Sequence, residues 1–177
     1  MQSFPWDRNR IARHKFHREK LVAPIYRRMY GYGTSDWRVA MAKQLNDKTM
    51  VDGQIDPADI GALKDQGVSM IINNRPDGED SNQPTSDQIS AAAEAAGIEY
   101  RHVPIDRGMG PAHVEAMRDA IHDAGEGKVF AFCRTGNRST LAWALARNED
   151  GVPREELERC AQGAGYSLDA IAHLLRD

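Results

Sequence analysis

The sequence is most informative at residues 129–140, which read VFAFCRTGNRST. The four apolar residues 129–132 are typical of a short strand that is buried on both faces. Cys133 follows at the end of this strand, and a helix is expected to begin near Ser139. In such an arrangement the loop N–H groups point inward and the helix N-terminus adds positive potential. Both effects favour the thiolate, which is the nucleophilic form of cysteine. We therefore predict that Cys133 is a catalytic nucleophile.

The residues that follow Cys133 suit the recognition of an anion. The guanidinium of Arg138 is expected to hold an oxyanion through paired hydrogen bonds, and Gly136 gives the loop backbone freedom that other residues lack. The other loop residues predicted to bind substrate are Arg134, Thr135, Asn137 and Ser139. The alternative for a cysteine is a small buried hydrophobic residue, which is our interpretation of Cys160. The complete loop favours the catalytic role for Cys133.

Outward from this loop, strand and helix signals alternate along the chain. A hairpin is predicted within 42–51, and strands at 68–72, 98–105 and 129–132. Helices are predicted to begin at Pro57, after Thr85 or Ser86 and at Pro111, and to cover about 139–148, 154–162 and 167–176. Strands that alternate with helices predict an α/β fold with three layers, α/β/α, around a mainly parallel central sheet.

Ligands of such sheets bind outside the carboxyl ends of the strands. The loops expected there are 73–80, 106–110 and 133–138. Arg75 and Asp77 in the first loop either flank the pocket or form a turn through local hydrogen bonds. Asp106 in the second loop is either a general acid or the residue that starts a turn. We predict that the site lies among these three loops.

Composition divides the chain into two parts. The 177 residues have a formal net charge of −3, but residues 1–40 carry nine basic and three acidic residues. We predict a basic, aromatic and helical arm over 1–40 and one α/β domain over 41–177. The arm is expected to contact its own domain or a second subunit, with an anionic membrane surface as the next option and nucleic acid as the least favoured.

The sequence also disfavours several classes of protein. Two cysteines cannot form a disulfide framework, and neither a secretory signal nor a membrane-spanning stretch is present, so we expect a cytoplasmic protein. His14 and His17 lack further metal ligands, and residues 125–128 (GEGK) lack the spacing of a nucleotide-binding loop. We therefore expect neither a metal nor another cofactor.

Three motifs carry a resemblance to a known family. They are Gly53-Gln54-Ile55, residues 72–79 (INNRPDGE) with Gln83-Pro84-Thr85, and the Cys133 loop. With these motifs the chain resembles the phosphatase-like domain of beta-lactamase-hydrolase-like proteins, over about residues 42–147. That family is related in fold to tyrosine and dual-specificity phosphatases. The resemblance therefore implies a tyrosine-phosphatase-like sheet and an enzyme that uses a cysteine.

The spacing within the Cys133 loop departs from the phosphatase pattern. The phosphatase signature has His before the cysteine, Gly three residues after it and Arg six residues after it. Here Phe132 precedes the cysteine, Gly136 is in the third place and Arg138 is in the fifth, with Ser139 in the sixth. A loop of this size resembles that of rhodanese-type sulfurtransferases.

The sequence therefore leads us to expect a sulfurtransferase. Cys133 would take sulfane sulfur from a small anionic donor, such as thiosulfate or a persulfide, and pass it to a thiol acceptor. The alternative is a phosphomonoesterase that acts on a phosphoester through a phosphocysteine at Cys133, with Asp106 as the general acid.

Overall fold

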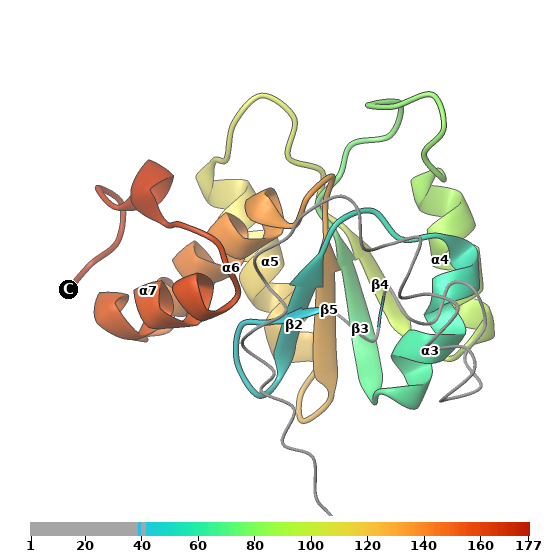
Figure 1. The fold of residues 1–177 in the computed structure, drawn as a ribbon, viewed down its shortest axis with the longest axis horizontal. Coiled ribbons are helices and arrows are strands. Elements are labelled where there is room, and N and C mark those ends of the chain that lie inside the picture. Colours follow the sequence, from blue (N-terminus) through green and yellow to red (C-terminus); the bar gives the residue numbers. More distant parts are fainter. Residues whose placement is uncertain (1–38, 40–41) are drawn as a thin grey trace, which may run out of the picture. The chain divides into compact units, whose positions relative to one another are not determined.

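The computed structural model describes Val39 and residues 42–177. The arm predicted over 1–40 lies outside the described residues, apart from Val39. Five strands form one sheet in the order β1-β2-β5-β3-β4 (Figure 1). The strands are β1 (Lys43–Gln44), β2 (Thr49–Asp52), β3 (Val68–Asn73), β4 (Glu99–His102) and β5 (Lys128–Phe132). The predicted hairpin is confirmed, because β1 pairs antiparallel to β2, and all other neighbours are parallel.

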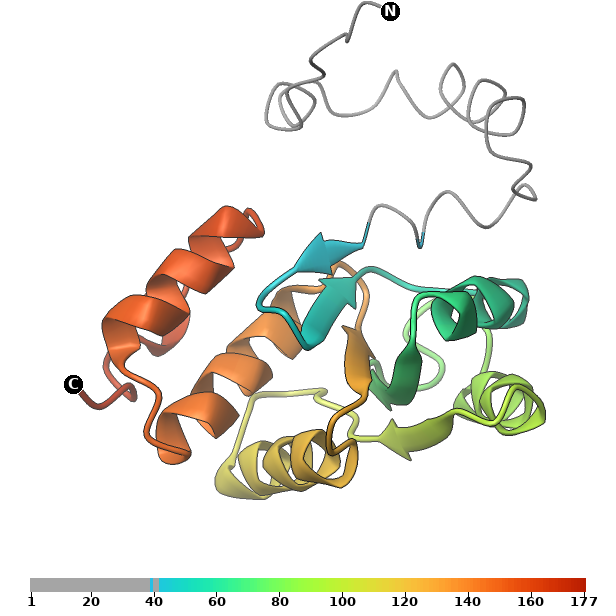
Figure 2. The same cartoon turned by 90° about the horizontal axis from the view of Figure 1, so that it is seen from below.

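Helices cover both faces of this sheet. They are η2 (Pro57–Asp59, a 3-10 turn), α3 (Ile60–Asp65), α4 (Ser86–Ala95), α5 (Pro111–Asp123), α6 (Asn137–Glu149), α7 (Arg154–Gly163) and η3 (Asp169–Ile171, a second 3-10 turn). Figure 2 shows α5 and α6 on one side of the strands and α3 and α4 on the other. The predicted three-layer α/β/α architecture is confirmed.

The alternation of side chains along β5 explains the two layers. Val129 and Ala131 belong to the core under α5 and α6, whereas Phe130 and Phe132 belong to the core under α3 and α4. All four are at most 2% exposed. Because successive side chains of a strand point to opposite faces, an apolar run of this kind is buried on both sides.

The segment after α7 differs from the prediction. A helix was expected over 167–176, but only the short turn η3 forms there. The side chain of Asn148 accepts a hydrogen bond from the Arg176 nitrogen at 2.7 Å and donates one to the Arg176 oxygen at 2.9 Å. In a helix over 167–176 the Arg176 nitrogen would donate to the Ala172 oxygen, whereas here it donates to the Asn148 side chain. The predicted strand over 98–105 is also shorter, since β4 ends at His102.

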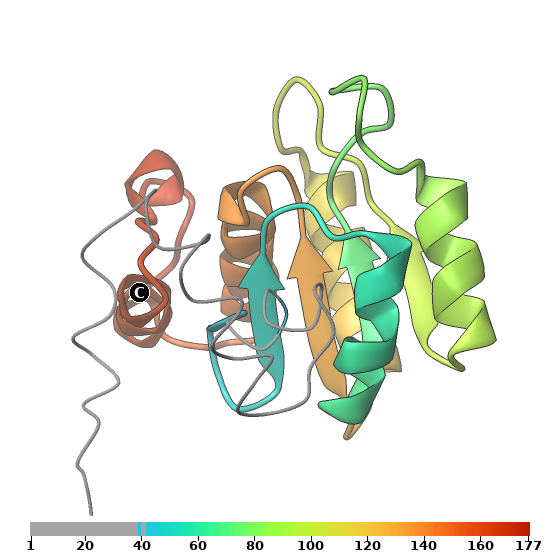
Figure 3. The same ribbon diagram turned by 45° about the vertical axis from the view of Figure 1, so that its right-hand side comes forward.

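The carboxyl ends of the parallel strands lie at one edge of the sheet, at the top of Figures 1 and 3. The loops after β3, β4 and β5 all emerge there. Backbone hydrogen bonds join these loops, because Asn74 donates to the Phe132 oxygen at 2.8 Å and Ile105 donates to the Asn74 oxygen at 3.1 Å. Within the part of the chain that the structure describes, no helix has the length and apolarity needed to cross a membrane.

Candidate active site

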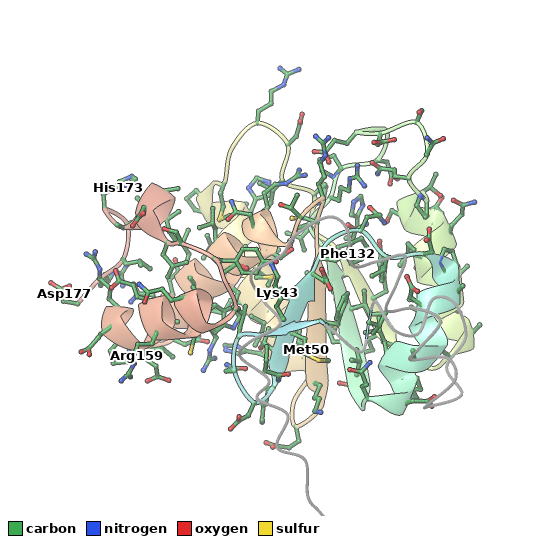
Figure 4. The ribbon with its side chains drawn as sticks, in the orientation of Figure 1. Lys43, Met50, Phe132, Arg159, His173 and Asp177 are labelled. Atoms are coloured by element: carbon green, nitrogen blue, oxygen red, sulfur yellow. The ribbon has the colours of Figure 1, made fainter. Side chains whose placement is uncertain are left out.

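Cys133 lies at the end of β5, where the strand passes into the loop before α6. Cys133 is 1% exposed. Figure 4 shows the preceding residue, Phe132, at the upper end of the strand. The backbone nitrogen of Gly136 donates a hydrogen bond to the Cys133 sulfur at 3.1 Å. A hydrogen bond donated to sulfur favours the thiolate over the thiol. Cys133 therefore lies between a buried strand and a helix N-terminus, as the sequence predicted.

Gly136 gives the loop its shape. It has φ of +84° and is the residue before the first turn of α6, a conformation that residues with a side chain rarely adopt. The nitrogen and the hydroxyl of Thr140 both donate to the Gly136 oxygen, at 3.0 and 2.9 Å. The loop thus turns back on itself so that Gly136 faces the sulfur with its nitrogen and α6 with its oxygen.

Arg138 lies in the first turn of α6 and is held by two other loops. Its Nη1 donates to the Ile105 oxygen at 2.8 Å, and its Nη2 donates to both carboxylate oxygens of Glu79, at 2.7 and 2.9 Å. Ile105 immediately precedes Asp106, so Arg138 anchors the start of the loop that carries the candidate general acid. This guanidinium therefore links the three loops that were predicted to form the site.

Arg75 contacts the same Glu79 carboxylate as Arg138. Its side chain is 5% exposed, and its Nε donates to Glu79 at 2.8 Å while Nη1 donates to the Gln54 side chain at 2.9 Å. Partial burial would raise the pKa of Glu79, but the hydrogen bonds and charges of Arg75 and Arg138 lower it below its ordinary value. Arg75 thus acts on Arg138 through Glu79. Glu79 was not among the predicted site residues. The sequence feature that could have indicated it is its position four residues after Arg75, which suits an ion pair.

The Gly53-Gln54 motif has a physical explanation in this site. A Cβ atom at Gly53 would lie 3.1 Å from the Arg134 oxygen, so glycine lets the Cys133 loop approach the end of β2 closely. The next residue, Gln54, orients Arg75. Two residues that sequence reasoning treated as markers of a family therefore shape the site.

The other predicted residues fall into three groups. Within the Cys133 loop, Arg134, Thr135 and Asn137 are exposed, whereas Ser139 is fully buried. Asp77 accepts a hydrogen bond from the Ser86 nitrogen at 2.8 Å, which anchors the N-terminus of α4. The Asp106 side chain is 73% exposed and lies 3.6 Å from Arg107. It is thus at the correct edge of the sheet but open to solvent, and its catalytic role stays a prediction.

Tyr166 is a second residue that the sequence did not indicate. It follows α7, and its hydroxyl donates to the Thr135 oxygen of the Cys133 loop at 3.0 Å.

Among the described residues no group of three or more His, Cys, Asp or Glu side chains could hold a metal ion.

The mostly parallel sheet, with Cys133 directly after its central strand β5, has the tyrosine-phosphatase type of fold. The family match agrees with this. The chain belongs to the family described as the phosphatase-like domain of beta-lactamase hydrolase-like proteins, which matches residues 42–149.

Similar proteins support the assignment. A beta-lactamase hydrolase-like protein of Agrobacterium fabrum is 35% identical over 139 residues, which are 76% of this chain and 31% of that protein. One from Xylella fastidiosa is 35% identical over 126 residues, which are 70% of this chain and 29% of that protein. The chain therefore spans less than a third of the length of these relatives.

Solved structures share the fold. A putative phosphatase from Neisseria meningitidis has a TM-score of 0.63 at 34% identity, over 75% of this chain and 94% of that one. The phosphatase Tk-PTP in its active form has a TM-score of 0.58 at 17% identity, over 72% of this chain and 87% of that one. The first is a related protein by sequence, and the second shows a common fold.

Proposed function

We propose that this chain is a cysteine-dependent phosphomonoesterase. The observation that carries the proposal is the arrangement around Cys133: its sulfur accepts the Gly136 N–H at 3.1 Å, and Arg138, five residues on, is fixed by Glu79 and Ile105. A thiolate at a helix N-terminus, with an oriented guanidinium in the first turn of that helix, suits attack on a phosphoryl group whose oxygens carry negative charge.

The reaction would proceed in two displacements. In the first, the Cys133 sulfur forms a bond to phosphorus while the bond from phosphorus to the ester oxygen breaks, and Asp106 gives its proton to the leaving oxygen. In the second, water attacks phosphorus, the phosphorus–sulfur bond breaks, and Asp106 takes the proton from the water. Inorganic phosphate leaves, and the thiolate is restored.

The similar proteins favour this function over the sulfurtransferase that the sequence led us to expect. The family is described as phosphatase-like, and the Neisseria protein at 34% identity is described as a putative phosphatase. Neither of these descriptions supports sulfur transfer. The expectation rested on the residues of the Cys133 loop and their spacing, whereas the phosphomonoesterase is supported by the fold and the family together.

Two observations still favour sulfur transfer as a second candidate. Arg138 is five residues after Cys133, not six, and Phe132 stands where the phosphatase pattern has His. In that reaction the thiolate attacks the sulfane sulfur of thiosulfate, the sulfur–sulfur bond breaks, and sulfite leaves with the electron pair of that bond. The resulting persulfide then passes its outer sulfur to a thiol acceptor.

The two functions separate in an assay with an aryl phosphate and with thiosulfate. We expect the native chain to hydrolyse the aryl phosphate, and Asp106→Asn to lower this rate by about 10²–10⁴-fold because the general acid is lost. Asp119→Asn, an exposed change on α5, is the matched control and should leave the rate unchanged. Sulfur transfer that dominates in the native chain and survives Asp106→Asn would refute the proposal in favour of the second candidate.

A further inference from the structure

Tyr166 reaches the Cys133 loop from outside the segment that matches the family. The matched residues end at 149, whereas Tyr166 follows α7. Its hydroxyl donates to the Thr135 oxygen at 3.0 Å. The C-terminal part of the chain therefore makes direct contact with the loop that carries the proposed nucleophile.

The C-terminal end of α7 fixes the backbone position of Tyr166. Gly165 has φ of +81°, its nitrogen donates to the Gln162 oxygen at 2.9 Å, and the Tyr166 nitrogen donates to the Ala161 oxygen at 2.8 Å. This pair of hydrogen bonds is a Schellman motif, which closes a helix with glycine in the left-handed region. The backbone of Tyr166 is thus held by the helix before it.

The peptide group between Thr135 and Gly136 connects Tyr166 to the sulfur. In a planar trans peptide the C=O and the N–H point in opposite directions. Tyr166 donates to the oxygen of this group, and the nitrogen of the same group donates to Cys133 at 3.1 Å. A hydrogen bond to the oxygen therefore fixes the plane that aims the N–H at the sulfur and polarises that N–H.

The contact is close, and it persists across the pH range of enzyme assays. A Cβ atom at Gly136 would overlap the Tyr166 hydroxyl and lie 2.9 Å from its ring carbon Cζ. Among the described residues, the charged or titratable groups that face Tyr166 are Lys43 of β1, Asp52 of β2 and Cys133. The Lys43 ammonium lies 4.0 Å from the ring centroid. Burial, and then the charges of Asp52 and Cys133, raise the pKa of Tyr166, so its hydroxyl remains protonated and able to donate.

We propose that Tyr166 is a positioning residue, which acts on Cys133 through the Thr135–Gly136 peptide and so increases the thiolate fraction of Cys133. It touches neither the substrate nor the sulfur in this role. The proposal rests on the proposed function only in taking Cys133 as the nucleophile, and it holds for phosphoryl and sulfur transfer alike.

The test compares Tyr166→Phe with the native chain in the alkylation of Cys133 by iodoacetamide as a function of pH. Peptide mass spectrometry distinguishes the Cys133 adduct from one at Cys160, the other free cysteine. The midpoint of the rate–pH profile reports ionisation, whereas the plateau reports access to the sulfur. We expect the midpoint to move up by about half a pH unit, which is about threefold slower alkylation below it.

Tyr100→Phe is the matched control, because Tyr100 is also partly buried but its hydroxyl contacts Asn73 and Ser86 instead of the loop. Its midpoint should equal that of the native chain. An unchanged midpoint in Tyr166→Phe, or an equal shift in Tyr100→Phe, overturns the proposal, whatever happens to the plateau. Because alkylation needs no substrate, the midpoint can shift even in a chain that hydrolyses no phosphoester, so failure of one proposal is distinct from failure of the other.

Discussion

Both carboxylate oxygens of Glu79 accept hydrogen bonds from Nη2 of Arg138, at 2.7 and 2.9 Å. Glu79 lies in the loop after β3 and Arg138 in the first turn of α6, 59 residues further along the sequence, and their side chains are 26% and 22% exposed. Because the Glu79 charge also meets Arg75, one carboxylate is shared by two guanidinium groups. The contact therefore fixes the direction of the Arg138 side chain.

Glu79→Gln tests this relationship. The substitution keeps the size of the side chain but removes the charge, so Arg138 loses its strongest anchor, and we expect kcat/KM for an aryl phosphate to fall by about 10–100-fold. We also expect a loss of about 1–2 kcal/mol in the free energy of unfolding near pH 7. Glu149→Gln, which breaks an ion pair with Arg118 on the helices α5 and α6, is the matched control and should leave kcat/KM unchanged.

The stability loss in Glu79→Gln should depend on pH. The Arg75 and Arg138 contacts lower the pKa of Glu79 from its ordinary value of 4.5, although partial burial opposes them. A lowered carboxyl pKa adds stability that is complete above the ordinary pKa and is lost as the pH falls through the lowered pKa. The difference between the native and variant unfolding free energies should therefore be constant above about pH 6 and shrink as the pH falls below 4.5. A difference that does not change with pH would show that the charge of Glu79 is not what stabilises the fold.

Cys133→Ser should abolish activity and leave the fold intact. The hydroxyl can accept the Gly136 N–H in place of the sulfur, so we expect the unfolding free energy to change by less than about 1 kcal/mol. Serine is not ionised near pH 7, and the rate should fall by at least about 10³-fold. Thermal unfolding and an aryl phosphate assay measure the two effects, with Cys160→Ser as the control that keeps activity. Full activity in Cys133→Ser would eliminate the cysteine mechanism.

Arg138→Lys separates charge from geometry. Lysine keeps the positive charge but cannot reach the Ile105 oxygen and Glu79 together and still present a planar fork to an oxyanion. We expect kcat/KM to fall by about 10–100-fold in steady-state kinetics. Arg118→Lys on α5 is the control, because its ion pair with Glu149 has a similar exposure. Native kinetics in Arg138→Lys would mean that charge alone is sufficient at this position.

The sequence predicted the fold well because its signals were local. The apolar run at 129–132, the prolines that start α5 and η2, and the capping residue Thr85 each determine an element without help from distant residues. The prediction was wrong over 167–176, where the Asn148 side chain takes the backbone groups of Arg176. That contact joins two residues that are 28 positions apart in the sequence, so no local pattern predicts it.

The site divides in the same way. Cys133, Gly136 and Arg138 could be found because they lie within six residues of one another, and the loop chemistry follows from their order. Glu79 had only one local signal, its spacing of four residues from Arg75, and Tyr166 had none, because each reaches the loop through tertiary packing. The same contrast explains the preference for a sulfurtransferase. The spacing from Cys133 to Arg138 is visible in the sequence, whereas the contacts that anchor Arg138 are not.

A one-residue insertion tests what that spacing means. Placed between Asn137 and Arg138, it gives the six-residue spacing of the phosphatase pattern, and from the sequence alone it should favour phosphate hydrolysis. Both residues, however, lie in the first turn of α6. One added helical residue rotates those that follow by about 100° relative to the loop and moves them by about 1.5 Å along the axis.

We therefore expect the insertion to separate Arg138 from Glu79 and Ile105, and to lower aryl phosphate hydrolysis by about 10²-fold. An alanine inserted at Gly151, in the turn between α6 and α7, controls for the added residue, because that turn lies at the other end of α6. Thermal unfolding establishes that both variants remain folded. If the insertion raises hydrolysis above the native rate, the short loop itself limits phosphate chemistry. In that case the anchoring of Arg138 by Glu79 is not what makes the native loop competent.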